Sequence, residues 1–400
     1  MANKLYCRVY QNAFKIGVNF LPWKFPEIIS GAGSIRRLPA VIKKDGVSSV
    51  LVVTDAVLNQ KLGMLNSLYE ELDKLGIKYV VYDGVQPNPT IDNIEAAREM
   101  YITNGCQGFI AFGGGSPMDC AKATAARIVR PNKTVPQLRG QLKVMKKIPP
   151  FYAVPTTAGT GSETTIAAVV SNPKTHEKNA INDTHLLPAY AVLDPELTTG
   201  LPKHITSTTG MDALTHAVEA YIGHSNTRDT ETQAKQATLL IFRYLKKAYD
   251  NGSDLEAREK MLLASHYAGK AFTRAYVGYV HSIAHNLGGT YGTPHGLANA
   301  VILPYVLDYY GETAYKRLAE LADVVGITAD GTDAGKAKAF IAEIRAMNEY
   351  MNIPKGFDFI QEKDIPTIVE RALKEGNPLY PVPKIMNETD CEAVIRSFMI

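Results

Sequence analysis

Short runs of β-branched and aromatic residues recur in the first part of the chain, with helical patterns between them. The runs are VLVVT (50–54), YVVY (79–82), GFIAF (108–112) and FYAV (151–154). Each has the length and composition of a buried strand. Residues 58–76 and 91–105 have helical spacing, and each segment ends at a glycine that suits a helix C-terminus. Strands that alternate with helices predict an α/β domain with a parallel sheet.

The second part of the chain has a different pattern. From about residue 205 the strand signal disappears, and long segments with helical periodicity follow one another. The segment LDPELTTGLPKHI (193–205) contains two prolines and a glycine and interrupts both patterns. A chain of 400 residues is long enough for two domains. We therefore expect an α/β domain over residues 1–204 and an all-helical domain over residues 205–400.

Composition narrows the class of protein. A hydrophobic content of 46% with 21% charged residues is ordinary for a globular chain, so disorder is not indicated. The formal net charge of +3 is spread along the chain without a Lys/Arg run, which argues against a nucleic-acid partner. Neither a signal peptide nor a membrane-spanning stretch is visible, and the four cysteines form no C-x-x-C pair. We expect a soluble cytoplasmic protein with reduced thiols.

A glycine turn follows the third predicted strand. In GGGSPMD, Ser116 suits a helix N-cap, Pro117 the first helical position, and Asp119 the place of a capping-box acid. Glycines ahead of a helix N-terminus let the backbone approach an anion, and the free N–H groups there would bind a pyrophosphate. The alternative is a tight turn that needs glycine and binds nothing. The motif is not the G-x-G-x-x-G fingerprint.

Two further segments suit the same ligand. Asp55 ends the strand VLVVT and would bind an adenosine ribose, which favours NAD over NADP; its alternative role is to cap the following helix. Asp55 precedes the glycines, whereas the acid of the ordinary dinucleotide fold follows them, so such a site would have a variant topology. The loop TTAGTGSETT (156–165) follows the strand FYAV and is rich in glycine and hydroxyls, which suit contact with a polar ligand; taken alone, it could be only a loop.

A carboxylate and several histidines form a candidate metal site. Asp212 and His216 are four residues apart, as are His281 and His285, so each pair would share one helix face; His295 follows shortly after. Any one of these histidines could instead be a hydrogen-bonded core residue. As a set, they suit Fe(II), Zn or a similar divalent ion. Neither pair reads H-E-x-x-H, which argues against a metalloprotease.

The glycine turn, TTAGTGSE, DALTHAVE, GYVHSIAHNLG and TPHG, in this order, resemble the iron-containing (group III) alcohol dehydrogenases over nearly the whole chain. The resemblance implies a dinucleotide-binding domain, a helical domain, an active site in the cleft between them, and a homo-oligomer of two or more chains. It implies metal ligands Asp212, His216, His281 and His295, with His285 beside the metal as a catalytic proton relay. The positions that match the family's cofactor site are Asp55, Gly114, Gly115, Ser116, Asp119, Thr156, Thr157, Thr160 and Lys178.

The function hypothesis is hydride transfer between a small alcohol or its aldehyde and NAD(H), with Fe(II) or Zn as Lewis acid. One departure from the family concerns the substrate, because Thr273 and Arg274 stand where small polar residues are common. An Arg274 that points into the pocket would favour a substrate with a carboxylate; the alternative is that its side chain points to solvent. Open alternatives are a hydroxyacid–oxoacid transhydrogenase, a glycerol dehydrogenase-like enzyme, a metal-dependent lyase like dehydroquinate synthase, and a binding module with a structural metal.

Overall fold

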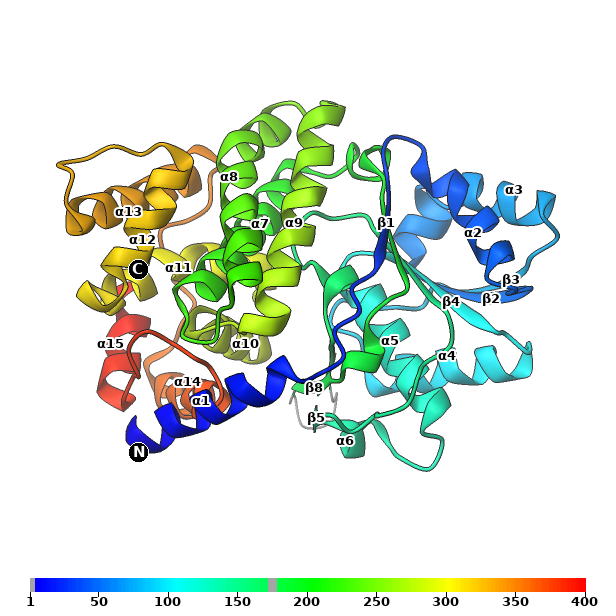
Figure 1. Cartoon of the computed structure of the whole chain (residues 1–400), viewed down its shortest axis with the longest axis horizontal. Coiled ribbons are helices and arrows are strands. Elements are labelled where there is room, and N and C mark those ends of the chain that lie inside the picture. The colour runs from blue at the N-terminus through cyan, green and yellow to red at the C-terminus, as the bar shows by residue number, and fades with distance from the viewer. Residues whose placement is uncertain (1–3, 172–177) are drawn as a thin grey trace. The chain divides into compact units, whose positions relative to one another are not determined.

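The computed structural model describes residues 4–171 and 178–400, except the side chains of residues 178 and 179. The chain divides into two compact units (Figure 1). The first comprises residues 1–21, 201–252 and 264–400, and the second residues 22–200 and 253–263. The division expected from the sequence, 1–204 and 205–400, placed the first residues with the strands instead. No helix in the described residues is both long and apolar enough to cross a membrane.

A parallel sheet forms the centre of the second unit. Within the described residues it has six strands in the order β1-β9-β6-β4-β2-β3, and all neighbouring pairs are parallel. Their bounds are Glu27–Ser30 (β1), Ser49–Val53 (β2), Lys78–Tyr82 (β3), Gly108–Gly113 (β4), Phe151–Pro155 (β6) and Tyr190–Leu193 (β9). The predicted strands correspond to β2, β3, β4 and β6. The edge strand β1 and its neighbour β9 carried no signal that we recognised.

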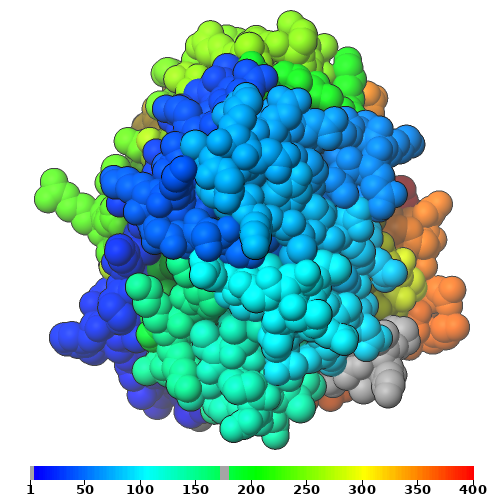
Figure 2. Space-filling model, turned by 90° about the vertical axis from the view of Figure 1, so that its right-hand side faces the viewer, coloured from blue at the N-terminus to red at the C-terminus, as the bar shows by residue number. Residues whose placement is uncertain are grey.

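Helices cover both faces of this sheet, which explains why its central strands are apolar at successive positions. Val50 and Val52 pack with α2 (Leu38–Lys44) and α3 (Asn66–Lys74) in one core. Leu51 and Val53 point to the opposite face and pack with α4 (Ile91–Thr103) and α5 (Gly115–Val129). Figure 2 shows the closely packed blue and cyan outer surface of these segments. The α/β fold class predicted for this part of the chain is confirmed.

Smaller elements complete the second unit. A three-stranded sheet among the described residues has the order β5-β8-β7. Its strands are Gly140–Gln141 (β5), Ala167–Ser171 (β7) and Lys178–Asn182 (β8). The short helical elements are η1 (Ser34–Arg37), the π-helical turn η2 (Val57–Lys61), α6 (Val135–Leu138), η3 (Ser162–Thr164), η4 (Thr184–Leu186) and η5 (Pro195–Thr198). The helix expected over 58–76 is therefore split into η2 and α3.

The first unit is helical in its described residues, as predicted for residues from about 205 onward. Its long elements are α1 (Lys4–Asn19), α7 (Lys203–Ile222), α8 (Arg228–Asp250), most of α9 (Leu255–Ala275), α10 (Tyr279–Tyr291), α11 (His295–Tyr310), α12 (Glu312–Val325), α13 (Asp333–Tyr350), α14 (Ile365–Gly376) and α15 (Glu388–Ser397), with the short η6 (Glu362–Asp364). Residues 211–222 of α7 are all buried, so this helix runs through the core of the unit.

The expected start of α5 is wrong by two residues. The helix begins at Gly115 with Gly114 as its N-cap, and no side chain caps it. Ser116 and Pro117 therefore lie inside the first turn. The Ser116 hydroxyl accepts a hydrogen bond from the backbone N–H of Asn88 (3.2 Å) instead of one from its own helix. The N–H groups at this helix end are thus left without a side-chain cap.

Candidate metal and cofactor sites

Four residues from three helices of the first unit converge on one point. Asp212 and His216 lie one turn apart on α7, His281 lies on α10, and His295 begins α11. Each offers one ligand atom, and these atoms all lie within 4.8 Å of one another. Asp212, His216 and His281 are buried, whereas the side chain of His295 is 30% exposed. The chain therefore brings together, in an accessible position, the set of residues expected to bind a metal.

Glycine at position 296 makes this convergence sterically feasible. A Cβ atom on Gly296 would lie 2.6 Å from the carbonyl oxygen of Thr208 and 3.5 Å from Cβ of Asp212. The first turn of α11 thus packs directly on the backbone of α7. Because His295 is the neighbour of Gly296, this close contact sets the imidazole beside the Asp212 carboxylate, with 3.5 Å between His295 Nε2 and Asp212 Oδ1.

A buried amide points into the cluster. Asn299 lies one turn after His295, and its Nδ2 donates to Asp212 Oδ1 (2.6 Å). The same nitrogen lies 3.2 Å from His281 Nε2 and 3.1 Å from His295 Nε2, while Oδ1 of Asn299 has no hydrogen-bond partner. The Nε2 atoms of both histidines therefore face the same centre as the carboxylate. Acceptors that face one another in this way suit a divalent cation.

Glu219 orients His281 from behind. Its Oε2 lies 2.6 Å from His281 Nδ1, and its carboxylate also accepts hydrogen bonds from the backbone N–H groups of Gly278 (2.9 Å) and Val280 (2.8 Å). Burial raises the pKa of Glu219, and the hydrogen bonds that it accepts lower it. Burial also lowers the pKa of His281 well below its ordinary value, so the ring is neutral near pH 7. A neutral imidazole with Nδ1 engaged leaves Nε2 as the ligand atom.

His285 has a similar partner. Its Nδ1 lies 2.6 Å from Oε1 of Glu375 on α14, and the hydroxyl of Tyr380 donates to the same oxygen (2.9 Å). The His285 ring stacks beside that of His295, with 5.0 Å between centroids. With Nδ1 directed to Glu375, Nε2 is the atom that remains for a proton transfer.

The cofactor residues expected in the second unit lie at adjacent strand ends. The chain runs from β2 outward to β3 and then returns to β4 on the other side of β2. Ligands of open parallel sheets bind at the carboxyl ends of strands where the order reverses in this way. Asp55 follows β2, Gly114 and Gly115 follow β4, and the loop 156–165 follows β6. The topology thus gathers these segments at one edge of the sheet.

The glycine turn and the threonine loop are in contact. A Cβ atom on Gly115 would lie 2.9 Å from Cγ2 of Thr160, and one on Gly114 would lie 3.3 Å from Oγ1 of Thr157. The N–H of Thr156 donates to the carbonyl of Gly113 (3.0 Å), where φ is +142°. Packing and backbone conformation therefore account for Gly113 and Gly115, and the turn forms one wall with the loop.

Two expected cofactor residues, Asp55 and Asp119, hydrogen-bond to other parts of the chain. Asp55 Oδ1 accepts a hydrogen bond from the N–H of Leu58 (3.0 Å), so it does cap the following turn. The two carboxylate oxygens of Asp119 accept from Ser162 Oγ and from the N–H of Val169, both at 3.1 Å. Asp119 therefore ties α5 to the threonine loop. The side chain of Lys178, at the start of β8, lies outside the described residues.

Comparison with known proteins identifies the family. The N-terminal model of the iron-containing alcohol dehydrogenases matches residues 26–195, and the C-terminal model of Fe-containing alcohol dehydrogenases matches residues 206–399. The chain belongs to the iron-containing alcohol dehydrogenase family. Family membership confirms the expected two-domain fold and makes the protein an oxidoreductase by class.

Relatives are similar over almost their full length. A 1,3-propanediol dehydrogenase of Citrobacter freundii is 39% identical, over 92% of this chain and 95% of its own. Alcohol dehydrogenase 4 of Schizosaccharomyces pombe is 36% identical, over 92% and 86% respectively. The structure of an alcohol dehydrogenase from Oenococcus oeni superposes with a TM-score of 0.90 at 34% identity, covering 94% of this chain and all of that one.

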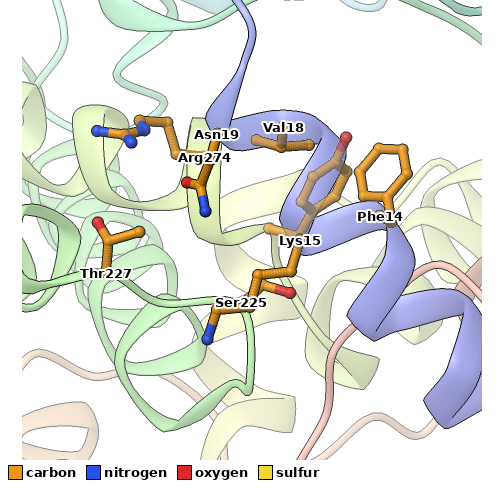
Figure 3. A pocket seen from close by; sticks show the side chains of 8 residues that line it. Phe14, Lys15, Val18, Asn19, Ser225, Thr227 and Arg274 are labelled. Carbon is orange, nitrogen blue, oxygen red and sulfur yellow. The ribbon is translucent and has the colours of Figure 1, made fainter.

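Arg274 does not face the cluster of proposed metal ligands. Its guanidinium Nη1 donates to Oδ2 of Asp229 (3.2 Å), and the Arg274 side chain lines a small pocket beside α1. Figure 3 shows the side chain extending on the side of Thr227, away from Phe14. Phe272, two positions earlier on α9, stacks on the His216 ring with 4.1 Å between centroids. Residues two apart on a helix face opposite ways, so Arg274 gives no support for a carboxylate substrate.

The sequence had not singled out four residues of these sites. Glu219 and Asn299 follow His216 and His295 by three and four residues, so helical spacing could have found them. Lys122 follows Asp119 by three residues, inside the glycine motif. Glu375 is 90 residues from its partner His285, and no local pattern connects the two.

Proposed function

We propose that this protein transfers a hydride between a small alcohol, or its aldehyde, and NAD(H), with a divalent metal in the helical unit. The observation that carries the proposal is the convergence of Asp212, His216, His281 and His295, whose ligand atoms lie within 4.8 Å of one another. Family membership supports the same chemistry. Relatives are named as dehydrogenases of 1,3-propanediol and methanol and as a lactaldehyde reductase, which suggests short alcohols, diols and aldehydes as substrates.

The metal would be held by one carboxylate and three imidazoles, a donor set that suits Fe(II) and also accepts Zn(II). When bound, a divalent cation supplies Lewis acidity toward an alcohol oxygen, and a nicotinamide supplies the hydride acceptor. Glu219 keeps His281 in the tautomer that presents Nε2. Asn299 holds Asp212 through its 2.6 Å hydrogen bond. We propose Fe(II) as the native ion.

His285 takes the role of proton relay. Its partly exposed ring lies beside His295, and its Nδ1 is engaged by Glu375. The free Nε2 accepts the proton that the alcohol releases as its carbon loses a hydride, and passes the proton toward solvent. In the reverse direction, His285 returns the proton to the carbonyl oxygen.

The second unit would hold the cofactor. The N-terminus of α5 has no side-chain cap, which leaves N–H groups for a pyrophosphate beside Gly114, Gly115 and Ser116. The hydroxyls of Thr156, Thr157 and Thr160, the carboxylate of Asp119 and the ammonium of Lys178 belong to the same proposed site. Asp55 at the end of β2 favours NAD over NADP because it would repel a 2′-phosphate. A cytoplasmic location and a homo-oligomer, such as a dimer, remain part of the proposal.

The test is metal-dependent turnover. The purified chain is stripped with a chelator and reconstituted anaerobically with Fe(II), or with Zn(II), and reduced cofactor is followed with short alcohols, diols, glycerol and hydroxyacids. NAD and NADP are run in parallel. We expect metal-restored NADH formation from a short primary alcohol or diol, and loss of both metal and activity in His281→Ala.

Other outcomes separate the alternatives. Turnover without net formation of NADH would favour a lyase, and exchange between a hydroxyacid and an oxoacid without free NADH would favour a transhydrogenase. An active His281→Ala variant that contains no metal would contradict the proposed centre.

A further inference from the structure

Lys122 is the largest charged side chain that is fully buried in the described residues, and the proposed chemistry does not use it. It lies in the second unit on α5, two turns after the start of that helix, and its side chain is 0% exposed. Five oxygens lie within hydrogen-bonding distance of its Nζ: the carbonyls of Ser162 (2.5 Å), Thr165 (2.8 Å) and Ala167 (3.1 Å), and the hydroxyls of Ser162 (3.2 Å) and Thr165 (3.0 Å).

All five oxygens belong to one short stretch of chain. Residues 162–167 form the end of the threonine loop and its continuation into β7. Three of the oxygens are backbone carbonyls, and buried carbonyls need donors. A single ammonium group therefore lies within hydrogen-bonding distance of three carbonyls of one short stretch, and the carbonyl of Ser162 also accepts from the N–H of Thr165 (3.2 Å). Asp119, one turn earlier on α5, accepts hydrogen bonds from Ser162 Oγ in this stretch and from the N–H of Val169 just beyond it.

This pairing fixes the geometry of the proposed cofactor wall. Thr157 and Thr160 are the loop residues that would contact a cofactor. They come shortly before residues 162–167, and they pack on Gly114 and Gly115. We propose that Lys122 is a positioning residue that holds the threonine loop in its cofactor-binding conformation before the cofactor arrives. The inference rests on the proposed function, because it presumes that the second unit binds NAD(H).

Burial changes the pKa of this lysine. Desolvation lowers the pKa of Lys122 to about 8, while the nearby carboxylates of Asp119 and Glu163 act in the opposite direction. A lysine that is costly to bury in its charged form remains there only if the surrounding oxygens compensate for lost water. The loop and the ammonium therefore depend on each other.

The test compares NADH binding by the full-length, metal-loaded protein and its Lys122→Met variant, using fluorescence titration. Methionine keeps most of the length of lysine but donates no hydrogen bond. We expect the Kd for NADH to rise by about tenfold or more, because the loop must then be ordered on binding. The turnover number at saturating cofactor should change by less than about twofold, since ordering is complete once cofactor is bound.

Arg127→Met is the matched control. Arg127 is a second buried cation on α5, but it binds Glu95 (2.6 Å) and the carbonyls of Arg130 and Pro131 rather than the threonine loop. We expect its NADH affinity to stay within about twofold of the unchanged protein. Amide hydrogen exchange over residues 156–167 should accelerate in Lys122→Met and stay unchanged in Arg127→Met.

Chemical rescue separates positioning from general destabilisation. Lys122→Ala should regain NADH affinity with n-propylammonium, which restores both charge and donors, and should not respond to tetramethylammonium, which has no N–H group. Thr165→Val is a milder second variant if neither lysine variant folds, and its Kd should rise by about two- to fivefold. Unchanged NADH affinity in the folded variants would overturn the inference. Failure of the unchanged protein to bind NADH would instead overturn the proposed function.

Discussion

At the scale of single residues, the metal cluster depends on side chains that do not touch the centre themselves. Glu219 engages Nδ1 of His281, and Glu375 engages Nδ1 of His285, each at 2.6 Å. An imidazole held at one nitrogen presents the other in a fixed direction. Each glutamate thus fixes one histidine ring at Nδ1. His281 faces the other proposed metal ligands, whereas His285 lies beside them, so we expect the two rings to have different roles.

Replacement of Glu219 by Gln should weaken metal binding. The amide has nearly the same shape, but its NH₂ group replaces one carboxylate oxygen and cannot accept the hydrogen bond that this oxygen now receives from Gly278 or from Val280. Replacing a residue that hydrogen-bonds a metal-binding histidine lowers metal affinity by roughly 10- to 100-fold. Competition with a chromophoric chelator measures the change for Zn(II) or Co(II). Glu320→Gln is the control, because that carboxylate binds Tyr221 and Arg317 and no histidine. Equal affinities in the two variants would contradict the assignment.

Replacement of Glu375 by Gln should slow turnover without loss of metal. His285, the proposed proton relay, would lose the partner that fixes its tautomer, and proton relays of this type contribute roughly 100-fold or more to rates. We expect the turnover number to fall by about tenfold, with metal content unchanged by elemental analysis. Glu370→Gln, on the exposed side of the same helix, serves as control. A variant that loses metal instead would show that Glu375 supports the cluster rather than the relay.

At the scale of elements, the proposed cofactor site is a contact between a turn and a loop. The turn follows β4, the loop follows β6, and the two strands pair directly. Small residues are required where the two segments meet, because a Cβ atom on Gly115 would come within 2.9 Å of Thr160. We therefore expect the glycine turn and the threonine loop to bind the cofactor together.

Gly115→Ala tests this contact. The added methyl group must push the loop away from the helix N-terminus, so NADH affinity should fall by about tenfold while metal affinity is unchanged. Isothermal titration calorimetry with each ligand measures both. Gly200→Ala provides the comparison, since a Cβ atom there would meet nothing within 4 Å. If Gly115→Ala binds NADH as tightly as the unchanged protein, the wall does not contact the cofactor.

At the scale of the whole molecule, the two ligands belong to different units. All four proposed metal ligands lie in residues 201–252 and 264–400, and the proposed cofactor residues lie in residues 22–200. Each unit has its own buried core, so each site can form from contacts within its own unit.

Metal and cofactor should accordingly protect different segments. Adding Zn(II) to the metal-free protein should slow amide exchange most strongly in α7, α10 and α11, and NADH should do so after β4 and β6. A ligand at 100 times its Kd stabilises the bound state by about 2.7 kcal/mol, which exchange rates resolve readily. Hydrogen-exchange mass spectrometry with each ligand alone is the measurement. Protection of the strand ends by metal would contradict the division of sites.

Much of this protein follows from local sequence pattern. We could predict the strands β2, β3, β4 and β6 and the helical second part of the chain. Short apolar runs and helical periodicity are patterns of neighbouring residues, so they can be recognised without the tertiary structure. The ligand types of the metal cluster were equally visible, since spacings of four residues put Asp212 and His216 on one face. Family motifs supplied the rest of the expected ligand set.

Tertiary structure decided what depends on distant contacts. The short edge strand β1 gains its identity only by pairing with β9, about 160 residues away. Ser116 was expected to cap α5, but the helix starts earlier and its hydroxyl binds Asn88. Glu375 reaches His285, and Lys122 reaches the threonine loop, only because folding brings α14 to α10 and β7 to α5. Sequence pattern determined the elements and the chemical groups; long-range packing determined which groups act on one another.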